Sequence, residues 1–376
     1  MISKFKISTL VLSLALVIPT FGYAASYYVD NDREKENGRD TVYTLSNDVN
    51  KNEVISFQRN AKGEMLRLGR FATGGTGTGG GLGNQGALAF SKNGDYLFAV
   101  NPGSNTLSVF SVGKNGKLKL IDVAANNGLR PVSVTVDKNR VFVVNAGDDT
   151  IFGYKFNRRA GKLEPLPLTH KRLSGSRTAP AQISFDNEGE VLVVTEKATN
   201  KITTFAIDED SNLPADGISF DSVGDTPFGF AFNKRNQLII SEANGGRAGE
   251  SSVSAYKVRD EGLLQLLSSA GAPGQAAACW IVTTPSGRIA YTTNTASGTV
   301  SSFTVNANGT LKLLQVVAAR EAGATDMAMS NDGKTLYVLA PGSNSVGEYS
   351  VDRNGALTKT STLPGLAAGV TGLLER

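Results

Sequence analysis

Two glutamates in this sequence, Glu196 and Glu242, stand where a carboxylate could act as a general base. Each ends a short apolar run typical of a buried strand, and Arg130 and Arg177 come shortly before two further runs of this kind. Such a carboxylate can take a proton from water, and a guanidinium can bind a substrate carboxylate or the oxyanion that develops on a carbonyl. The pattern favours attack of activated water on a carbonyl group, with Glu196, Glu242 and Arg130 as the catalytic candidates.

Further polar side chains stand at the beginnings and ends of other apolar runs. If these runs form a ring of sheets, the side chains converge on one opening, and such a concave polar site with one tryptophan suits a small oxygen-rich ligand such as a sugar, lactone or carboxylate. The alternative is that they pair with each other and with loop backbone. Besides Arg177, the candidate ligand-binding residues are Gln85, Gln182, Trp280, Asp326, Asn101, Asn145 and Asn294, with Thr226 at an equivalent position.

Other kinds of chemistry find little support. The single histidine, His170, lies among polar and basic residues and is expected to be exposed, which disfavours Ser-His-Asp and Cys-His sites. The only cysteine, Cys279, falls in an apolar run and is expected to be a buried thiol. Residues 30–38 carry oxygen ligands without the spacing of a calcium loop, so calcium is a minor alternative. We expect no metal and no cofactor.

A glycine-rich run at residues 74–83 contains one GxGxxG match, at Gly75, Gly77 and Gly80. No helix follows whose N-terminus could hold a phosphate, and no Lys-Ser/Thr pair is present. The run is therefore interpreted as a flexible connection between two sheets, placed where it could act as a lid.

The elements that must position these residues recur with a period near 48 residues. Short apolar strands begin each unit at intervals of 46 to 51 residues, and each is followed by a turn and a second apolar strand. A third strand alternates apolar and polar residues, and another glycine turn leads to a fourth. Four antiparallel strands per unit predict a β-propeller blade. The predicted innermost strands are residues 86–90, 132–136, 181–185, 228–232, 279–283 and 326–330.

The two ends of the chain predict how the ring closes. The first unit, residues 41–73, supplies only three strands, and residues 369–374 follow the last unit where another innermost strand would begin. We therefore predict an all-β, seven-bladed propeller in which the C-terminal strand completes the first blade, because closure removes the free sheet edges. Residues 41–376 form one domain, preceded by a tail at residues 25–40.

Residues 1–24 have the pattern of a secretory signal, with Lys4 and Lys6, an apolar stretch and a small-x-small site before Ala25. We expect a periplasmic or extracellular protein with no membrane segment after the signal is removed. The net charge then falls from +4 to +2, and no basic run with interleaved aromatics is present, which disfavours nucleic acid as a partner. A monomer is expected.

Several stretches resemble a known family. The run Leu97–Asn101 followed by Ser104–Phe110, repeated at 337–340 and 343–349, looks like the lactonase-type seven-bladed propellers. That family includes bacterial propeller-type 6-phosphogluconolactonases and fungal carboxymuconate cyclases. Stretches at 193–200, 226–232, 240–243 and 278–280 look closer still to exported bacterial members. The resemblance covers essentially the whole chain after the signal.

The resemblance implies hydrolysis of a sugar or carboxylated lactone, and Glu196 stands where the family has a glutamate. The family's Arg-His pair is replaced by Ala181 and Gln182, and the preceding blade has Arg130 without a histidine. Two functions therefore stay open. One is an exported lactonase-like hydrolase, and the other is a non-catalytic exported propeller that binds a glycan, a cell-wall fragment or a protein.

Overall fold

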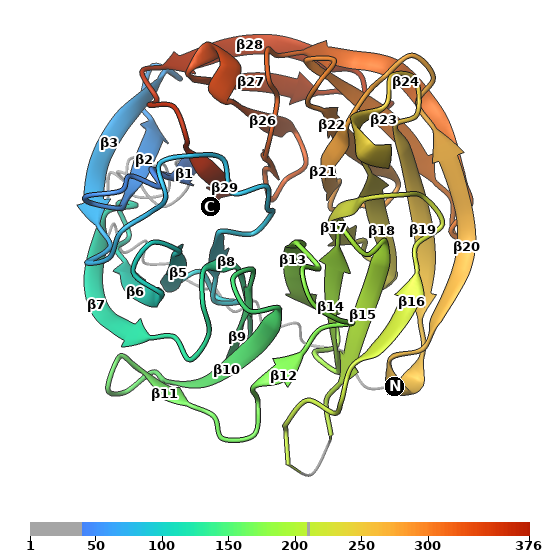
Figure 1. Cartoon of the computed structure of the whole chain (residues 1–376). Helices are drawn as coiled ribbons and strands as arrows, with labels where there is room; N and C mark the ends of the chain where they lie inside the picture. Colours follow the sequence, from blue (N-terminus) through green and yellow to red (C-terminus); the bar gives the residue numbers. More distant parts are fainter. Residues whose placement is uncertain (1–39, 209–210) are drawn as a thin grey trace, which may run out of the picture.

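A ring of seven antiparallel sheets forms the body of the protein in the computed structural model, which describes residues 40–208 and 211–376 (Figure 1). Six sheets have four strands, and in the seventh the outermost strand is divided into β11 and β12. The predicted seven-bladed propeller is confirmed. The predicted signal segment, the calcium alternative at residues 30–38 and nearly all of the 25–40 tail lie outside the described residues.

The blades share one order of strands from the centre outward. The innermost strands are β29 (Thr371–Glu375), β4 (Leu88–Phe90), β8 (Pro131–Asp137), β13 (Pro180–Phe185), β17 (Pro227–Phe232), β21 (Ala278–Thr283) and β25 (Met327–Met329). The second strands are β1 (Thr41–Leu45), β5 (Tyr96–Asn101), β9 (Arg140–Asn145), β14 (Val191–Glu196), β18 (Gln237–Glu242), β22 (Ile289–Asn294) and β26 (Thr335–Ala340).

Outside these lie the third and fourth strands. The third strands are β2 (Glu53–Arg59), β6 (Thr106–Val112), β10 (Thr150–Asn157), β15 (Lys201–Ala206), β19 (Ser252–Val258), β23 (Thr299–Val305) and β27 (Ser345–Val351). The outer strands are β3 (Met65–Ala72), β7 (Leu118–Ala125), β11 (Lys162–Pro165), β12 (Lys171–Arg172), β16 (Ile218–Asp221), β20 (Leu264–Gly271), β24 (Leu311–Arg320) and β28 (Leu357–Pro364). Short 3₁₀ turns are η1 (Asn244–Gly246), η2 (Asp260–Gly262) and η3 (Pro341–Ser343).

Burial explains the sequence pattern of each strand position. Strands β9 and β14 are buried at all six positions, because neighbouring blades pack on both of their faces. Such strands read as continuous apolar runs, as in other sheets that are covered on both sides. The outer strand β3 is mostly exposed or half-buried and accordingly carries charged residues.

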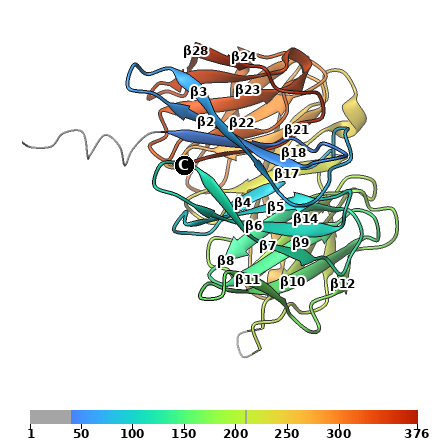
Figure 2. The same cartoon turned by 90° about the vertical axis from the view of Figure 1, so that its left-hand side faces the viewer.

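The strands run between two faces of the ring, as the side view shows (Figure 2). We call the face seen in Figure 1 the front face: there the second strands end and the innermost strands begin. The opposite side is the back face. Among the described residues, no helix has the length and the apolar character needed to cross a membrane.

The glycine-rich run crosses the front face from the first blade toward the centre (Figure 1). It connects the first two blades, as predicted, and backbone contacts fasten part of it to the loop after β1. The amide of Gly77 donates to the Asp48 carbonyl at 2.6 Å and that of Gly79 to the Asn47 carbonyl at 2.8 Å. Glycine is needed at this approach, since a Cβ on Gly77 would lie 2.2 Å from the Asn47 carbonyl carbon.

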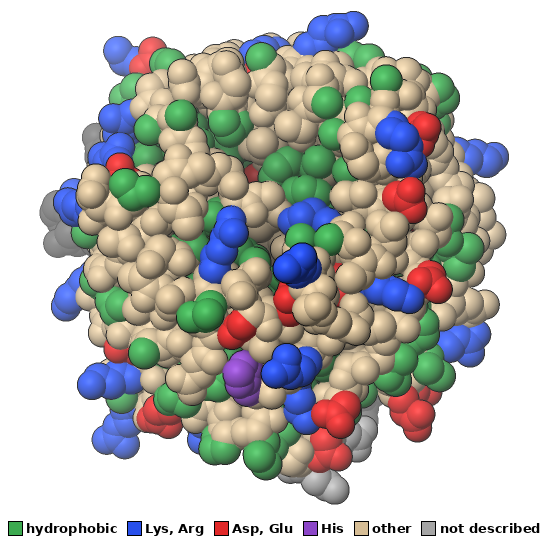
Figure 3. Space-filling model, viewed as in Figure 1, with side chains coloured by type: hydrophobic (Ala, Val, Ile, Leu, Met, Phe, Trp, Pro, Cys, Tyr) green, Lys and Arg blue, Asp and Glu red, His purple; other side chains and the backbone are tan. Residues whose placement is uncertain are grey.

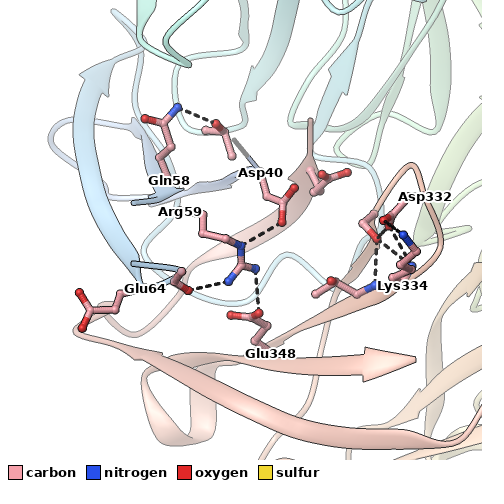
Figure 4. Close-up of polar contacts among 12 residues, drawn as sticks. Asp40, Gln58, Arg59, Glu64, Asp332, Lys334 and Glu348 are labelled. Carbon is pink, nitrogen blue, oxygen red and sulfur yellow. Dashed lines mark hydrogen bonds and ion pairs between the residues drawn. The ribbon is translucent and has the colours of Figure 1, made fainter. Parts of the chain in front are cut away.

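The ring is closed by pairing of the C-terminal strand β29 with β1, as predicted. A hydrogen bond from the Leu373 amide to the Asp326 carboxylate, at 3.1 Å, ties the closing strand to the last blade. Near the back face, Arg59 of β2 donates to Glu348 of β27 at 2.8 Å and to Asp40 at 3.1 Å (Figure 4). The first and last blades are therefore joined through both strand pairing and charge.

We predict that deletion of residues 369–376 abolishes cooperative unfolding or lowers its midpoint strongly. Without β29, strand β1 presents an open edge and the last blade loses the neighbour on its inner side. Thermal unfolding followed by circular dichroism measures this. An unchanged midpoint and an equally sharp transition would show that closure does not stabilise the ring.

The unfolding free energy should also depend on the protonation of Asp326. Burial raises the pKa of this carboxyl to about 7, against an ordinary value near 3.9. A group whose pKa is raised by folding stabilises the folded state when protonated, so its contribution is complete below about pH 4 and is lost as the pH rises to about 7. The loss is at most about 4 kcal/mol.

Urea denaturation between pH 4.5 and 8 compares the protein with its Asp326→Asn variant. We expect the wild type to lose more stability over this range than the variant, whose amide cannot ionise. Glu375 contributes in the same direction in both proteins, because burial and the charges of Asp40 and Asp332 raise its pKa to about 7. Parallel pH profiles for the two proteins would contradict a titrating Asp326.

Candidate functional site

The asparagines that end the second strands hold their own blades together. Asn101, Asn145 and Asn294 are fully buried. The side-chain amide of Asn101 donates to Ser108 at 2.7 Å, and that of Asn294 donates to Ser301 at 2.8 Å, both on the neighbouring third strand. These side chains fasten the second strand to the third. The structure does not bring them to the central opening.

Glu196 and Glu242 occupy the same position in their blades and are also fully buried. The Glu196 carboxylate accepts hydrogen bonds from Thr203, Thr199 and both the amide and the hydroxyl of Ser174. Glu242 accepts from Ser252 at 2.6 Å, and also from Ser254, Ser222 and the Gly224 amide. Burial raises the pKa of Glu242, while these hydrogen bonds oppose that effect.

The expectation that the second-strand ends point into the opening is therefore wrong, and the pleat of the strand is the reason. Successive side chains in a strand point to opposite sides. The last residue of β14, Glu196, points toward the third strand and the loop that leads into its blade. The next residue, Lys197, points toward the centre, where its Nζ atom donates to the carbonyls of Gly83 and, at 3.3 Å, Pro180.

Two glutamines, Gln85 just before β4 and Gln182 within β13, form a plug across the channel. Gln85 exchanges two hydrogen bonds with the backbone of Ile281, at 2.8 and 3.1 Å, three blades away around the ring. Gln182 does the same with Phe230 of the next blade, at 3.0 and 2.7 Å. Gly229 makes room, since a Cβ there would lie 2.0 Å from the Gln85 side-chain oxygen. Both glutamines thus act as backbone partners in the core of the ring.

The plug separates the front mouth from a cavity of about 380 Å³ in the back half of the channel. Gln85, Gln182 and Asp326 all line this cavity. Asp326 is 3 % exposed, and its carboxylate is engaged by the amides of Met327 and Leu373. These three predicted ligand-binding residues belong to the plug and to the ring closure, not to the front mouth.

The predicted arginines do lie on the front face, with exposed side chains. Each stands in a loop held by the blade before it: the Arg130 amide donates to Asn105 at 2.6 Å, and the Arg177 amide donates to Asp149 at 2.7 Å. The Thr226 amide donates to Asn200 in the same way, at 2.7 Å. These backbones are rigidly held although the side chains are free to contact a ligand.

Both arginines adopt left-handed backbone conformations, with φ of 56° for Arg130 and 57° for Arg177. A non-glycine residue in this region is strained, and such strain persists only where surrounding contacts enforce it. Thr226 is strained in the same way, with φ of 58°. The loops leading into three consecutive blades therefore share one enforced geometry at the rim of the front mouth.

Trp280 forms the floor of the front mouth together with Phe228. Their ring centroids are 4.8 Å apart, and the indole N–H of Trp280 donates to the Asn84 carbonyl at 2.7 Å. The Lys197 nitrogen lies 4.9 Å from the Phe228 ring centroid. We define the front mouth by Arg130, Lys197, Phe228 and Trp280, and the space-filling view shows a central hollow surrounded by Lys and Arg side chains (Figure 3).

Lys197 is the functional candidate that the sequence analysis missed. Burial and the charge of Arg130 lower its pKa to about 8. A signal was present in the sequence: the residues that directly follow the second strands are small or prolines except in one blade. They are Ser46, Pro102, Ala146, Lys197, Ala243, Thr295 and Pro341.

Other expectations about reactive groups are tested by the described residues. His170 is exposed, as predicted, and its ring lies 6.2 Å from that of Phe152, in an edge contact. Cys279 is a buried free thiol, also as predicted, and burial raises its pKa to about 11. In the part of the chain that the structure describes, no group of three or more His, Cys, Asp or Glu side chains could hold a metal ion.

A ring of seven blades with a basic and aromatic front mouth places this protein among the seven-bladed propellers. The chain belongs to the lactonase, 7-bladed beta-propeller family, which it matches over residues 36–172 and 246–366. The unmatched stretch between them contains Glu196, Lys197 and Glu242. No curated protein matches the chain.

Solved structures of similar fold include a Bacteroides fragilis protein provisionally named a 6-phosphogluconolactonase. It is 20 % identical, with a TM-score of 0.73 over 90 % of this chain and 98 % of the other. The periplasmic gluconolactonase PpgL of Pseudomonas aeruginosa is 14 % identical, with a TM-score of 0.69 over 89 % and 99 % of the two chains. At these identities the likeness establishes the fold.

We predict that Glu196→Gln lowers the stability of the protein by about 1–3 kcal/mol, because the amide nitrogen would face donors that the carboxylate now accepts from. Chemical denaturation measures the loss, and Glu188→Gln, an exposed glutamate in the turn before β14, is the matched control. Equal stability of Glu196→Gln and wild type would show that the carboxylate is not a structural acceptor.

Proposed function

We propose that this protein hydrolyses a sugar lactone or carboxylated lactone bound at the front mouth. The observation that carries the proposal is the pairing of two basic side chains with an aromatic floor: Arg130 and Lys197 are close enough to influence each other's charge, and Phe228 and Trp280 lie beneath. Membership of the lactonase family supports the reaction type. A carboxylate or phosphate group would be held by the Arg130 guanidinium, and the sugar ring would pack on the aromatic rings.

Arg130 would also stabilise the transition state. Attack of water on a lactone carbonyl places negative charge on its oxygen, and a positive group fixed beside that oxygen lowers the barrier because it need not reorganise during the reaction. The enforced backbone at Arg130 supplies such a fixed position. Arg177, on the rim one blade further, is proposed as an additional contact for the substrate.

Export is part of the proposal. The signal-like residues 1–24 and the likeness to a periplasmic gluconolactonase support a periplasmic or extracellular location. Mass spectrometry of the protein from cell fractions tests it, since processing would leave Ala25 at the N-terminus, and an intact Met1 on the native protein would contradict it.

A second function is favoured by a specific observation. Glu196 and Glu242, the carboxylates expected to activate water, are buried and engaged by hydroxyl and amide donors. A mouth without an accessible carboxylate suits a propeller that binds an anionic sugar, a glycan or a cell-wall fragment without turning it over. Binding of sugar acids measured by calorimetry, with no turnover of any lactone, would identify this alternative.

The decisive experiment is a pH-stat assay of the purified protein on a panel of γ- and δ-lactones that includes glucono-δ-lactone and its 6-phosphate. We expect turnover above the spontaneous rate, and Arg130→Gln should raise KM for anionic lactones about tenfold or more, as loss of one charged hydrogen bond does. The control is Arg353→Gln, an exposed arginine in the turn between β27 and β28 at the back face. An unchanged KM for Arg130→Gln would remove this residue from the site.

A further inference from the structure

The hydrogen bonds of Lys197 are compatible with a neutral amine. Its Nζ atom donates to two backbone carbonyls, those of Gly83 and Pro180. A neutral primary amine has two N–H bonds and one lone pair, whereas an ammonium has three N–H bonds and no lone pair. Two carbonyl acceptors therefore use both hydrogens of the neutral form and leave its lone pair directed away from them.

Burial and a like charge disfavour a positive charge on Lys197 and outweigh the attraction of an aromatic ring. The nitrogen lies over the Phe228 ring, whose face attracts a cation, and it faces two ionisable groups, Arg130 from the loop before β8 and Cys279 on β21. Arg130 is a like charge. Cys279 is a buried thiol that stays neutral, because burial raises its pKa to about 11. Among the described residues, no Asp or Glu carboxylate forms an ion pair with Lys197.

We propose that neutral Lys197 is the general base of the lactone hydrolysis proposed above, on which this inference rests. Its lone pair takes a proton from water as the water oxygen bonds to the lactone carbonyl carbon, and the carbonyl π electrons move onto the carbonyl oxygen beside the Arg130 charge. When this intermediate collapses, the ring C–O bond breaks and the ammonium returns the proton to the departing alkoxide. One lactone and one water give one hydroxy acid.

The position of Lys197 explains how the protein dispenses with an accessible carboxylate and with histidine. A useful general base has a pKa close to the working pH, and desolvation together with Arg130 brings the pKa of this lysine to about 8. Lys197 is only half-buried, whereas Glu196, its neighbour in sequence, is fully buried. The base is thus Lys197, which directly follows Glu196 at the end of β14 and points to the opposite side of the strand.

Substitution tests the role directly. We expect Lys197→Met to lower kcat on glucono-δ-lactone and its 6-phosphate about 100-fold or more, as loss of a general base commonly does. Lys197→Arg should lose as much kcat, because a guanidinium stays protonated and cannot act as a base. The matched control is Lys201→Met, since Lys201 lies on the same blade in an ion pair with the largely exposed Asp221.

Two further readouts separate a base from a structural lysine. The kcat/KM of the wild type should rise with pH with unit slope and level off near pH 8, the pKa of Lys197. Competitive labelling with acetic anhydride between pH 6 and 11, read by peptide mass spectrometry against free N-acetyl-lysine amide, should show Lys197 half-deprotonated near pH 8.

The outcomes distinguish this role from the function on which it rests. Turnover that survives in Lys197→Met, or that returns in Lys197→Arg, overturns the base and leaves the lactonase function standing. Loss of turnover in Glu196→Gln with retained turnover in Lys197→Met would assign the base to the carboxylate instead. If the wild type turns over no lactone, the proposed function fails, and the base role fails with it even if Lys197 labels near pH 8.

Discussion

Closure of the ring is the constraint on which every other feature of this protein depends. Each blade is a four-stranded sheet with two apolar faces, so it is stable only between two neighbours, and the last blade can have a second neighbour only if the chain returns to its beginning. The pairing of β29 with β1 provides that return. Asp326 and Arg59 reinforce it at the two ends of the seam. A central mouth exists only because the seam is closed.

The fold could be predicted because its signals are local and repeated. Apolar runs, turn residues and their spacing recur in every unit, and an error in one unit is corrected by the others. The direction of a side chain at a strand end is harder to predict than the fold. Successive side chains point to opposite sides, so an error of one residue reverses the direction. The interpretation placed Glu196 in the opening, but the pleat turns Glu196 outward and Lys197 inward.

The remaining site residues depend on contacts between distant segments that no local pattern encodes. Gln85 and Ile281 are 196 residues apart in the sequence. Only the assembled ring shows that the side-chain amide of Gln85 pairs with the Ile281 backbone, as the backbone of a neighbouring strand would. Trp280 and Arg130 were correctly placed at the front face because their strand beginnings were identified. Polar residues at the centre of a propeller therefore have two uses, to satisfy the inner backbone and to meet a ligand, and the sequence shows only that they are polar.

Crowding of the inner strands at the centre of the ring determines the chemistry of the front mouth. Inner strands of seven blades converge there, so that backbone carbonyls and aromatic rings replace water around any long side chain that enters. A carboxylate needs donors, and Glu196 and Glu242 find theirs on the outer side of the strand ends. The inner side offers carbonyl acceptors. An amine is the side chain that such acceptors can hold, and desolvation lowers its pKa in the direction that makes it a base.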